Sequence, residues 1–247
     1  MVETDRQFAP DSRPVDGSLS VFFPCYNERE NLEALVYEAV EVLDGLGREY
    51  EIIVVNDGST DGTGPLADAL TAKIPSLKVV HHPVNSGYGM ALRSGFRAAA
   101  KEVVFYTDGD RQFDMKELPG ILPLIERYDI VSCYRLNRRE GIIRRFNAYC
   151  WTRLVCFLFD LKLKDIDCAF KLYKRRIFDR FELVSTGALI DTEILARAAR
   201  LGYTITQTGV HHYPRMAGKS TGANIKVILR AFAELLKLRK TILGGRS

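Results

Sequence analysis

Short apolar runs alternate with segments of helical periodicity along the first half of this chain of 247 residues. The runs are rich in Val, Ile, Leu and Phe and almost free of charge, which is typical of parallel strands buried on both faces by helices. We therefore predict an α/β fold with a mostly parallel sheet between helices. The expected strands are 19–24, 51–57, 77–82, 103–108 and 129–135. The expected helices between them are 31–47, 64–73 and 87–102, with helical turns at 116–128.

The rest of the chain is less regular. We interpret residues 1–18 as a flexible N-terminal tail, 19–222 as one catalytic domain, and 223–247 as a C-terminal amphipathic helix with a short tail. Within the second half, the patterns predict one long helix, a strand or turn that enters a helix, an amphipathic helix, a pair of strands and a basic helix. These segments are, in order, 138–164, 168–178, 191–202, 203–213 and 224–243.

Charge and cysteine content narrow the class of protein. The net charge is +4 with a pI near 8.7, which is too mild to imply a nucleic-acid partner. Five cysteines without a C-x-x-C pair indicate neither a disulfide framework nor a zinc site, and favour a reducing compartment. The sequence shows no signal peptide and no apolar span of about 18 residues. We expect a protein that is cytoplasmic or lies peripherally on the cytoplasmic face of a membrane.

Carboxylates gather directly after the expected strand 103–108. Asp108, Asp110 and Asp114 lie within seven residues of one another, and Gln112 stands between them. Such carboxylates repel each other unless water or a cation separates them. The stretch is therefore either an ordinary acidic loop or a site for Mg²⁺ or Mn²⁺, which prefer oxygen ligands.

Polar clusters also follow the first two strands, at 24–28 and 56–63. Ligands of open α/β sheets bind outside the carboxyl ends of the strands, so these clusters are expected at one edge together with Asp108 and Asp110. Asp57 can accept hydrogen bonds from a ligand there. The alternative is a plain strand-to-helix turn in which Asp61 and Thr63 cap the next helix, and the motif alone does not decide between the two.

The order of these motifs resembles family 2 glycosyltransferases of the GT-A fold. The similarity extends over roughly residues 19–222 and is strongest to the polyprenyl-phosphate group, typified by dolichyl-phosphate mannose synthase. It rests on the sequences PCYNE at 24–28, NDGSTDGT at 56–63, NSGYG at 85–89, DGD at 108–110, DIDCAFKLYKR at 165–175 and RMAGKS at 215–220.

This resemblance implies a role for each matching residue. The nucleotide and its sugar are expected at Pro24, Tyr26, Glu28, Asp57 and Asp108, and the metal, Mg²⁺ or Mn²⁺, at Asp108, Asp110 and Gln112. Asp108, Asp110, Arg135 and Arg215 are the expected catalytic residues. The acceptor and its phosphate are expected at Arg135, Arg145, Arg215, Lys219 and Ser220, with Glu193 as an acceptor-side acid.

The implied reaction is inverting transfer of a hexose from a nucleotide sugar, of the GDP-mannose or UDP-glucose type, to a polyprenyl phosphate. That acceptor is already an anion, so no general base is required. The alternative within the family is a hydroxyl acceptor, which needs a base, with Asp191 or Glu193 as candidates. A third hypothesis is a nucleotide-sugar-binding scaffold without catalysis, although the intact set of Asp108, Asp110 and Gln112 argues against it.

Two basic segments suggest a membrane surface as a further partner. Six arginines and one acid lie between 135 and 153, interleaved with Phe146, Tyr149 and Trp151. In the helix expected at 224–243, an apolar stripe is flanked by lysines and arginines, which suits an anionic lipid surface. The alternatives are a solvated helix face with core aromatics for the first segment, and packing on the domain or on a partner for the second.

Overall fold

The computed structural model describes residues 17–136, 142–215 and 225–244. The N-terminal half contains β1 (Leu19–Cys25), α1 (Arg29–Gly45), β2 (Tyr50–Asp57), α2 (Thr63–Thr71), β3 (Leu77–His82), α3 (Tyr88–Ala98), β4 (Val103–Thr107), η1 (Met115–Glu117), α4 (Leu118–Ile121) and α5 (Leu124–Arg127). The C-terminal half contains β5 (Ile130–Ser132), β6 (Tyr134–Leu136), α6 (Ile142–Phe159), β7 (Phe170–Lys174), η2 (Arg175–Asp179), α7 (Ile190–Arg200), β8 (Ile205–Thr206), β9 (Gly209–His211) and α8 (Ile225–Gly244).

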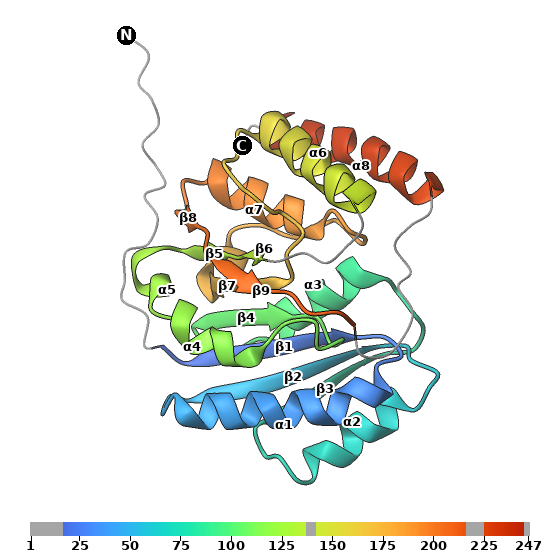
Figure 1. Cartoon of the computed structure of the whole chain (residues 1–247), viewed down its shortest axis with the longest axis vertical. Helices are drawn as coiled ribbons and strands as arrows, with labels where there is room; N and C mark the ends of the chain where they lie inside the picture. Colours follow the sequence, from blue (N-terminus) through green and yellow to red (C-terminus); the bar gives the residue numbers. More distant parts are fainter. Residues whose placement is uncertain (1–16, 137–141, 216–224, 245–247) are drawn as a thin grey trace.

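A seven-stranded sheet in the order β3-β2-β1-β4-β7-β5-β8 forms the centre of the molecule (Figure 1). All neighbouring strands pair in parallel except β7, which runs antiparallel to both β4 and β5. Leu19 of β1 pairs with Tyr50 of β2 on one side and with Val103 of β4 on the other. The carboxyl ends of β1, β2 and β4 therefore meet at one edge, and the predicted GT-A type α/β fold is confirmed.

The apolar runs form the core of this sheet. Every residue of β1 and β4 is buried. Aromatic rings cross from strand to strand and to α3, with the rings of Phe22 and Tyr106 stacked at 5.4 Å and Phe96 edge-on to both. Full burial of each large apolar side chain stabilises the fold by about 1.5–3 kcal/mol. The edge that carries the polar loops is thus built on fully buried strands.

The predicted strand 129–135 is wrong as a single element. It divides at Cys133 into β5, which belongs to the main sheet, and β6, which pairs with β9 in a separate two-stranded sheet. The backbone N–H of Cys133 still bonds to Phe170 of β7, whereas that of Tyr134 already bonds to Thr208. The chain changes partner between adjacent residues, which apolar periodicity does not reveal.

The predicted helix 138–164 is too long at its carboxyl end. α6 ends at Phe159, and Asp160 follows with a φ of 53°, a left-handed conformation that terminates helices. Residues 137–141 lie outside the described residues. The remaining elements of the C-terminal half match the predicted patterns, although the strands at 203–213 are shorter than expected.

α6 and α8 lie side by side beyond α7, at the opposite end of the molecule from α1 and α2 (Figure 1). Trp151 of α6 packs edge-on against Phe232 of α8, with their rings 5.5 Å apart. Arg239 of α8 donates to the carbonyl of Leu158 at 3.2 Å. Within the described part of the chain, no helix has the length and apolarity that a bilayer span requires. Residues 1–16 of the predicted tail 1–18 lie outside the described residues. Gly17 and Ser18 do not belong to a tail, because both are buried and the Ser18 carbonyl accepts from the N–H of Val103 at 3.0 Å.

Candidate functional site

The loops after β1 and β2 are joined by a set of short-range hydrogen bonds. The N–H of Asn27 donates to the Ser59 hydroxyl at 3.0 Å, and the Asn27 side chain accepts from the N–H of Thr60 at 2.8 Å. The N–H of Glu28 donates to the Thr63 hydroxyl at 3.0 Å. These contacts fix the two loops against each other. Tyr26 lies at the surface of the first loop with 43% of its area exposed, and the preceding Pro24 is buried.

The prediction that Asp61 and Thr63 cap α2 holds only in part, because Gly62 is the N-cap residue and no side chain caps the helix. Asp61 accepts from the N–H of Thr63, the first residue of α2, at 2.9 Å, and from the N–H of Arg29 at 3.1 Å. Burial raises the pKa of Asp61, but the hydrogen bonds from Thr63 and Arg29 outweigh it and lower the pKa overall. Both residues therefore stabilise the turn.

Asp57, at the end of β2, fixes the segment that leads to α3. Its carboxylate accepts from the N–H groups of Ser86 and Gly87 at 2.8 and 2.9 Å and lies 2.6 Å from the ring of His82. The residue is 3% exposed. Its two oxygens are thus engaged within the fold, and its predicted contact with a nucleotide stays a prediction.

Asp108 and Asp110 follow β4 and lie against the end of β1. A Cβ atom at Gly109 would come within 2.6 Å of the Cys25 sulfur, so the absence of a side chain allows this close approach. Asp108 accepts from the Tyr88 hydroxyl at 3.0 Å. Burial, and then repulsion by Asp110, raises the pKa of Asp108 to about 7. The protein therefore holds two carboxylates closer together than their charges favour.

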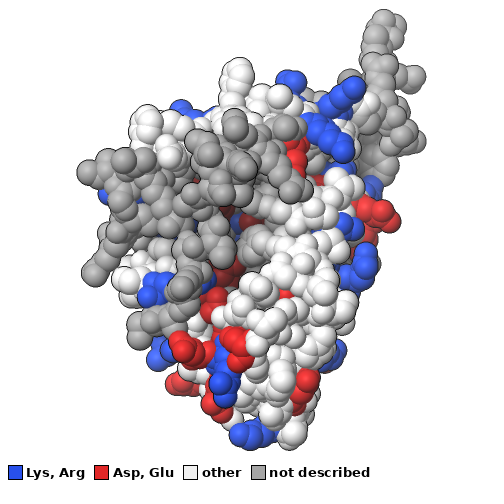
Figure 2. Space-filling view, turned by 90° about the vertical axis from the view of Figure 1, so that its right-hand side faces the viewer, with Lys and Arg blue, Asp and Glu red and all other residues white. Residues whose placement is uncertain are grey.

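Arg215 joins this pair to the wall formed by the first loop. Its guanidinium donates to Asp110 at 2.8 and 3.3 Å and to Glu28 at 3.3 Å. Burial raises the pKa of Glu28. Two carboxylates thus contact the guanidinium, and a third, Asp108, lies near enough for its charge to act on Arg215. Acidic side chains gather along a hollow on one face of the molecule (Figure 2). Because the carboxylates outnumber the guanidinium, a bound cation would reduce the repulsion between them.

Gln112 completes the oxygen donors at this edge. Its side-chain N–H donates to the carbonyl of Tyr213 at 2.9 Å, and its backbone N–H donates to Asp110 at 3.1 Å. The amide oxygen of Gln112 is not used in these bonds. Among the described residues, no group of three or more His, Cys, Asp or Glu side chains has the arrangement of a complete metal site. The donors match Mg²⁺ or Mn²⁺, which take few protein ligands and complete their shell with water and phosphate oxygens.

The comparison with known families is consistent with this arrangement. The profile described as Glycosyl transferase family 2 matches residues 20–181, more than half of the chain. The chain belongs to glycosyl transferase family 2. The matched range contains the loops after β1, β2 and β4, and the protein is a nucleotide-sugar glycosyltransferase.

Solved structures of one enzyme share the fold. They are glucosyl-3-phosphoglycerate synthase from Mycobacterium tuberculosis in complex with phosphoglyceric acid (TM-score 0.68, 20% identity), with Mn²⁺, UDP-glucose and phosphoglyceric acid (0.68, 19%), and with Mg²⁺ and UDP (0.67, 19%). The matches cover 93% of this chain and 80–81% of the other. At this identity the matches establish the fold of this chain and not its acceptor. The matched enzyme is not a member of the polyprenyl-phosphate group to which the sequence motifs are most similar.

The arginines predicted to bind phosphate differ from one another in burial and in their partners. Arg135 makes a two-pronged ion pair with Asp165 at 2.7 and 2.9 Å, and both side chains are largely buried. A contact with a phosphate would require this pair to open. Arg145 is exposed on α6. Lys219 and Ser220 lie outside the described residues, so the structure brings together Arg215 alone with the carboxylates.

The two acids considered as general bases are both engaged. Asp191 accepts from Lys171 at 2.8 Å and from the hydroxyl of Tyr106, and all three side chains are buried. Glu193 accepts from the N–H of Ser185 at 2.7 Å and from Arg197 at 2.8 Å, and it also receives the N–H of Val184. Glu193 therefore fixes the segment before α7, which is a structural role that the sequence motif did not indicate.

Asp167 is a candidate that the motif comparison missed. Desolvation by the surrounding protein, followed by repulsion from Asp165 and Asp191, raises the pKa of Asp167 to about 6. Its side chain is exposed to solvent, so an acceptor can reach it. The only signal in the sequence was its place two residues after Asp165, inside the segment that matched the family.

Proposed function

We propose that this glycosyltransferase is inverting and metal-dependent, and that it moves a hexose from a nucleoside-diphosphate sugar to a polyprenyl phosphate. The carrying observation is the unbalanced cluster of Asp108, Asp110 and Glu28 around Arg215 at the carboxyl ends of β1 and β4. This is where the family fold places a ligand. A departing nucleoside diphosphate develops negative charge, which a cation and Arg215 are suited to neutralise.

The residues present fit a divalent cation. Asp108, Asp110 and the amide oxygen of Gln112 would hold Mg²⁺ or Mn²⁺, which would neutralise charge on the leaving diphosphate. Tyr88 holds the Asp108 carboxylate in place, and Arg215 orients Asp110. The structures of glucosyl-3-phosphoglycerate synthase that contain Mn²⁺ or Mg²⁺ with UDP support this assignment.

The proposed acceptor rests on the surroundings of Asp191 and Glu193, because neither acid is free to act as a general base. Asp191 is paired with Lys171, and Glu193 accepts hydrogen bonds from its own loop and from Arg197. A phosphate is already ionised at neutral pH and attacks without losing a proton, so this arrangement favours a phosphate acceptor over a hydroxyl. The resemblance to the polyprenyl-phosphate group supports the same choice.

A hydroxyl acceptor is the second candidate, because Asp167 offers a different base. A carboxyl with a pKa near 6 is poised to accept a proton at neutral pH. The structural relatives bound to phosphoglyceric acid also point to a small acceptor of their own. Substitution of Asp167 separates the two candidates, since a phosphate acceptor does not need it as a base.

The end of the molecule formed by α6 and α8 supports a lipid acceptor. Apolar side chains stand open to solvent on both helices, with Phe157 84% and Leu236 63% exposed. Arg153, Lys237 and Lys240 are exposed beside them. Exposed aromatic and aliphatic groups among basic side chains suit an anionic bilayer surface, so we infer peripheral attachment through this end.

A donor and acceptor panel tests the function. The protein is incubated with polyprenyl phosphate, Mg²⁺ or Mn²⁺, and GDP- and UDP-sugars, and the expected product is a lipid-soluble glycosyl phosphate that does not form when EDTA is present. Turnover only with hydroxyl acceptors, abolished by Asp167→Asn, would replace the proposal by the second candidate. Nucleotide binding without turnover on any acceptor would favour the scaffold hypothesis.

A further inference from the structure

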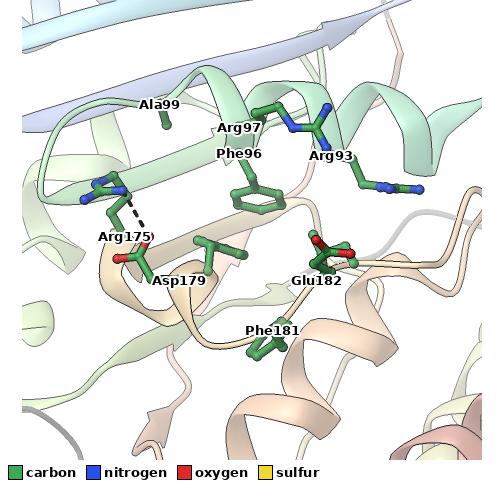
Figure 3. Close-up of a pocket in the computed structure, with 10 residues that line it drawn as sticks. Arg93, Phe96, Arg97, Ala99, Arg175, Asp179, Phe181 and Glu182 are labelled. Atoms are coloured by element: carbon green, nitrogen blue, oxygen red, sulfur yellow. Dashed lines mark hydrogen bonds and ion pairs between the residues drawn. The ribbon is translucent and has the colours of Figure 1, made fainter.

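A cavity lies near the start of β4, at the end of that strand opposite to the carboxylate cluster. It has a volume of about 330 Å³ and lies between the second half of α3 and the segment 175–183. Figure 3 shows the ring of Phe96 between Arg175 and Asp179 on one side and Arg93 and Glu182 on the other. The volume is in the range of pockets that accept small organic molecules.

Arginines dominate the polar lining of this cavity. Arg93 and Arg97 lie one turn apart on α3, and Arg175 comes from the start of η2. Arg175 pairs with Asp179 at 3.3 Å. In the described part of the chain, neither Arg93 nor Arg97 pairs with a carboxylate, and the contact recorded for Arg93 is with the Met90 sulfur at 3.5 Å. Asp179 and Glu182 also line the cavity, and Figure 3 shows Glu182 on the same side of Phe96 as Arg93. Three arginines therefore stand against two carboxylates, so the lining keeps a net charge of +1.

The rest of the lining is aromatic. The rings of Phe96 and Phe178 are stacked with their centroids 4.2 Å apart, and Phe181 continues the cluster. Arg197 in turn lies over the outer ring, Phe181, at 5.7 Å. A planar apolar group can pack on such rings while an attached oxyanion reaches the guanidinium forks.

The position of the cavity separates it from the donor site. The N–H of Arg175 bonds to the carbonyl of Glu102, which directly precedes β4, whereas Asp108 follows the other end of that strand. Five strand residues correspond to about 16 Å. α3 connects the two places, because Tyr88 at its start bonds to Asp108 and Arg97 near its end lines the cavity.

We propose that this cavity binds a small organic oxyanion, a phosphate or carboxylate attached to a planar apolar group. Arg93 and Arg97 bind the oxyanion, and Phe96 and Phe178 pack against the planar group. Neither contact involves a residue that the nucleotide sugar or the acceptor is expected to use, so the site is independent of the proposed transfer reaction.

Phenyl phosphate and benzoate are suitable probes, measured by isothermal titration in the presence of saturating Mn²⁺ with GDP or UDP to occupy the donor site. We expect saturable binding of one or both probes, and weaker binding of inorganic phosphate, which lacks a ring. A preference between the two probes distinguishes a phosphate from a carboxylate ligand. Arg93→Gln and Arg97→Gln are each expected to weaken binding by about tenfold, because each removes a charge-assisted hydrogen bond.

Arg200→Gln is the matched control, since Arg200 is an exposed arginine at the end of α7, outside the cavity. It is expected to leave the affinity for both probes unchanged. Circular dichroism of each variant shows whether the fold is retained. Absence of saturable binding at millimolar concentrations, or equal affinity in wild type, Arg93→Gln and Arg97→Gln, overturns the proposal.

Discussion

Two charged clusters lie near the middle of this glycosyltransferase, and they differ in balance. In the first, Asp110 and Glu28 pair with Arg215, and the charge of Asp108 acts on the same guanidinium. In the second, Lys171 pairs with Asp191 one to one, and both are buried in the sheet and against α7. Among the described residues, carboxylates outnumber the one cation in the first cluster, whereas the second is balanced.

This difference separates the proposed binding site from a structural element. A buried charge must be paired within the protein, because its desolvation is otherwise costly, and the pair of Lys171 and Asp191 satisfies that condition. In the first cluster, burial and then repulsion between carboxylates raise the pKa values of Asp108 and Glu28. A bound cation would relieve that repulsion. Imbalance near solvent, rather than the number of charges, therefore marks the site.

The largest expected effect concerns the balanced pair. Lys171→Met leaves Asp191 buried without its cation, and we expect the free energy of unfolding to fall by about 3–5 kcal/mol. The double variant Lys171→Met with Asp191→Asn removes both charges and should recover much of that loss. Guanidinium chloride unfolding measures both. A single variant as stable as the double one would show that the pair is not balanced as described.

Asp110→Asn tests the unbalanced cluster. We expect transfer to fall by at least about a hundred- to a thousandfold, since the substitution removes a ligand for the cation that neutralises the leaving diphosphate. The free energy of unfolding should not fall, because the cluster loses excess negative charge. Initial rates and denaturant unfolding give the two readouts.

Asp114→Asn is the matched control for that experiment. Asp114 belongs to the same acidic loop, and its side chain accepts a hydrogen bond from the N–H of Lys116 in η1. The side-chain oxygen of asparagine can accept the same hydrogen bond. Its transfer rate should stay near that of wild type. Near-normal transfer in Asp110→Asn, or equal losses in the two variants, would mean that the cation site is misplaced.

Arg215→Gln tests the positive member of the same cluster. Transfer should fall by about ten- to a hundredfold, because one positive group is lost from the leaving diphosphate. Mn²⁺ affinity, measured by electron paramagnetic resonance without nucleotide, should not fall, since the guanidinium no longer competes for Asp110. A parallel loss of Mn²⁺ affinity would indicate that Arg215 builds the site rather than balancing it.

The sequence was sufficient for the first half of the fold. The strands from Leu19 to Thr107 were predicted within about two residues, because strands buried on both faces are almost continuously apolar. The break at Cys133 and the end of α6 at Asp160 were not predicted. The first depends on hydrogen-bond partners distant in sequence, and the second has neither Gly nor Pro to mark it.

The site was predicted as a set of residues but not as a set of pairs. The motifs correctly brought Glu28, Asp108, Asp110 and Arg215 to one edge of the sheet. They did not reveal that Arg135 pairs with Asp165, because an ion pair across 30 residues depends on the path of the chain between them. The same holds for Glu193, whose partners lie in a loop without a sequence signature.

The smallest expected effect concerns Asp167, which lies close to the balanced pair without belonging to it. Its pKa of about 6 in the folded protein exceeds its ordinary value of 3.8, so the folded state holds the proton more tightly than the unfolded chain. Stability therefore falls as the pH rises from about 4 to 6 and stays lowered above that range. Asp167→Asn should raise the free energy of unfolding at pH 8, by less than about 1 kcal/mol because the side chain is screened by solvent, and should leave it unchanged below pH 4. Urea unfolding at both pH values measures this, and an equal shift at the two would show that packing, rather than repulsion from Asp165 and Asp191, accounts for the difference.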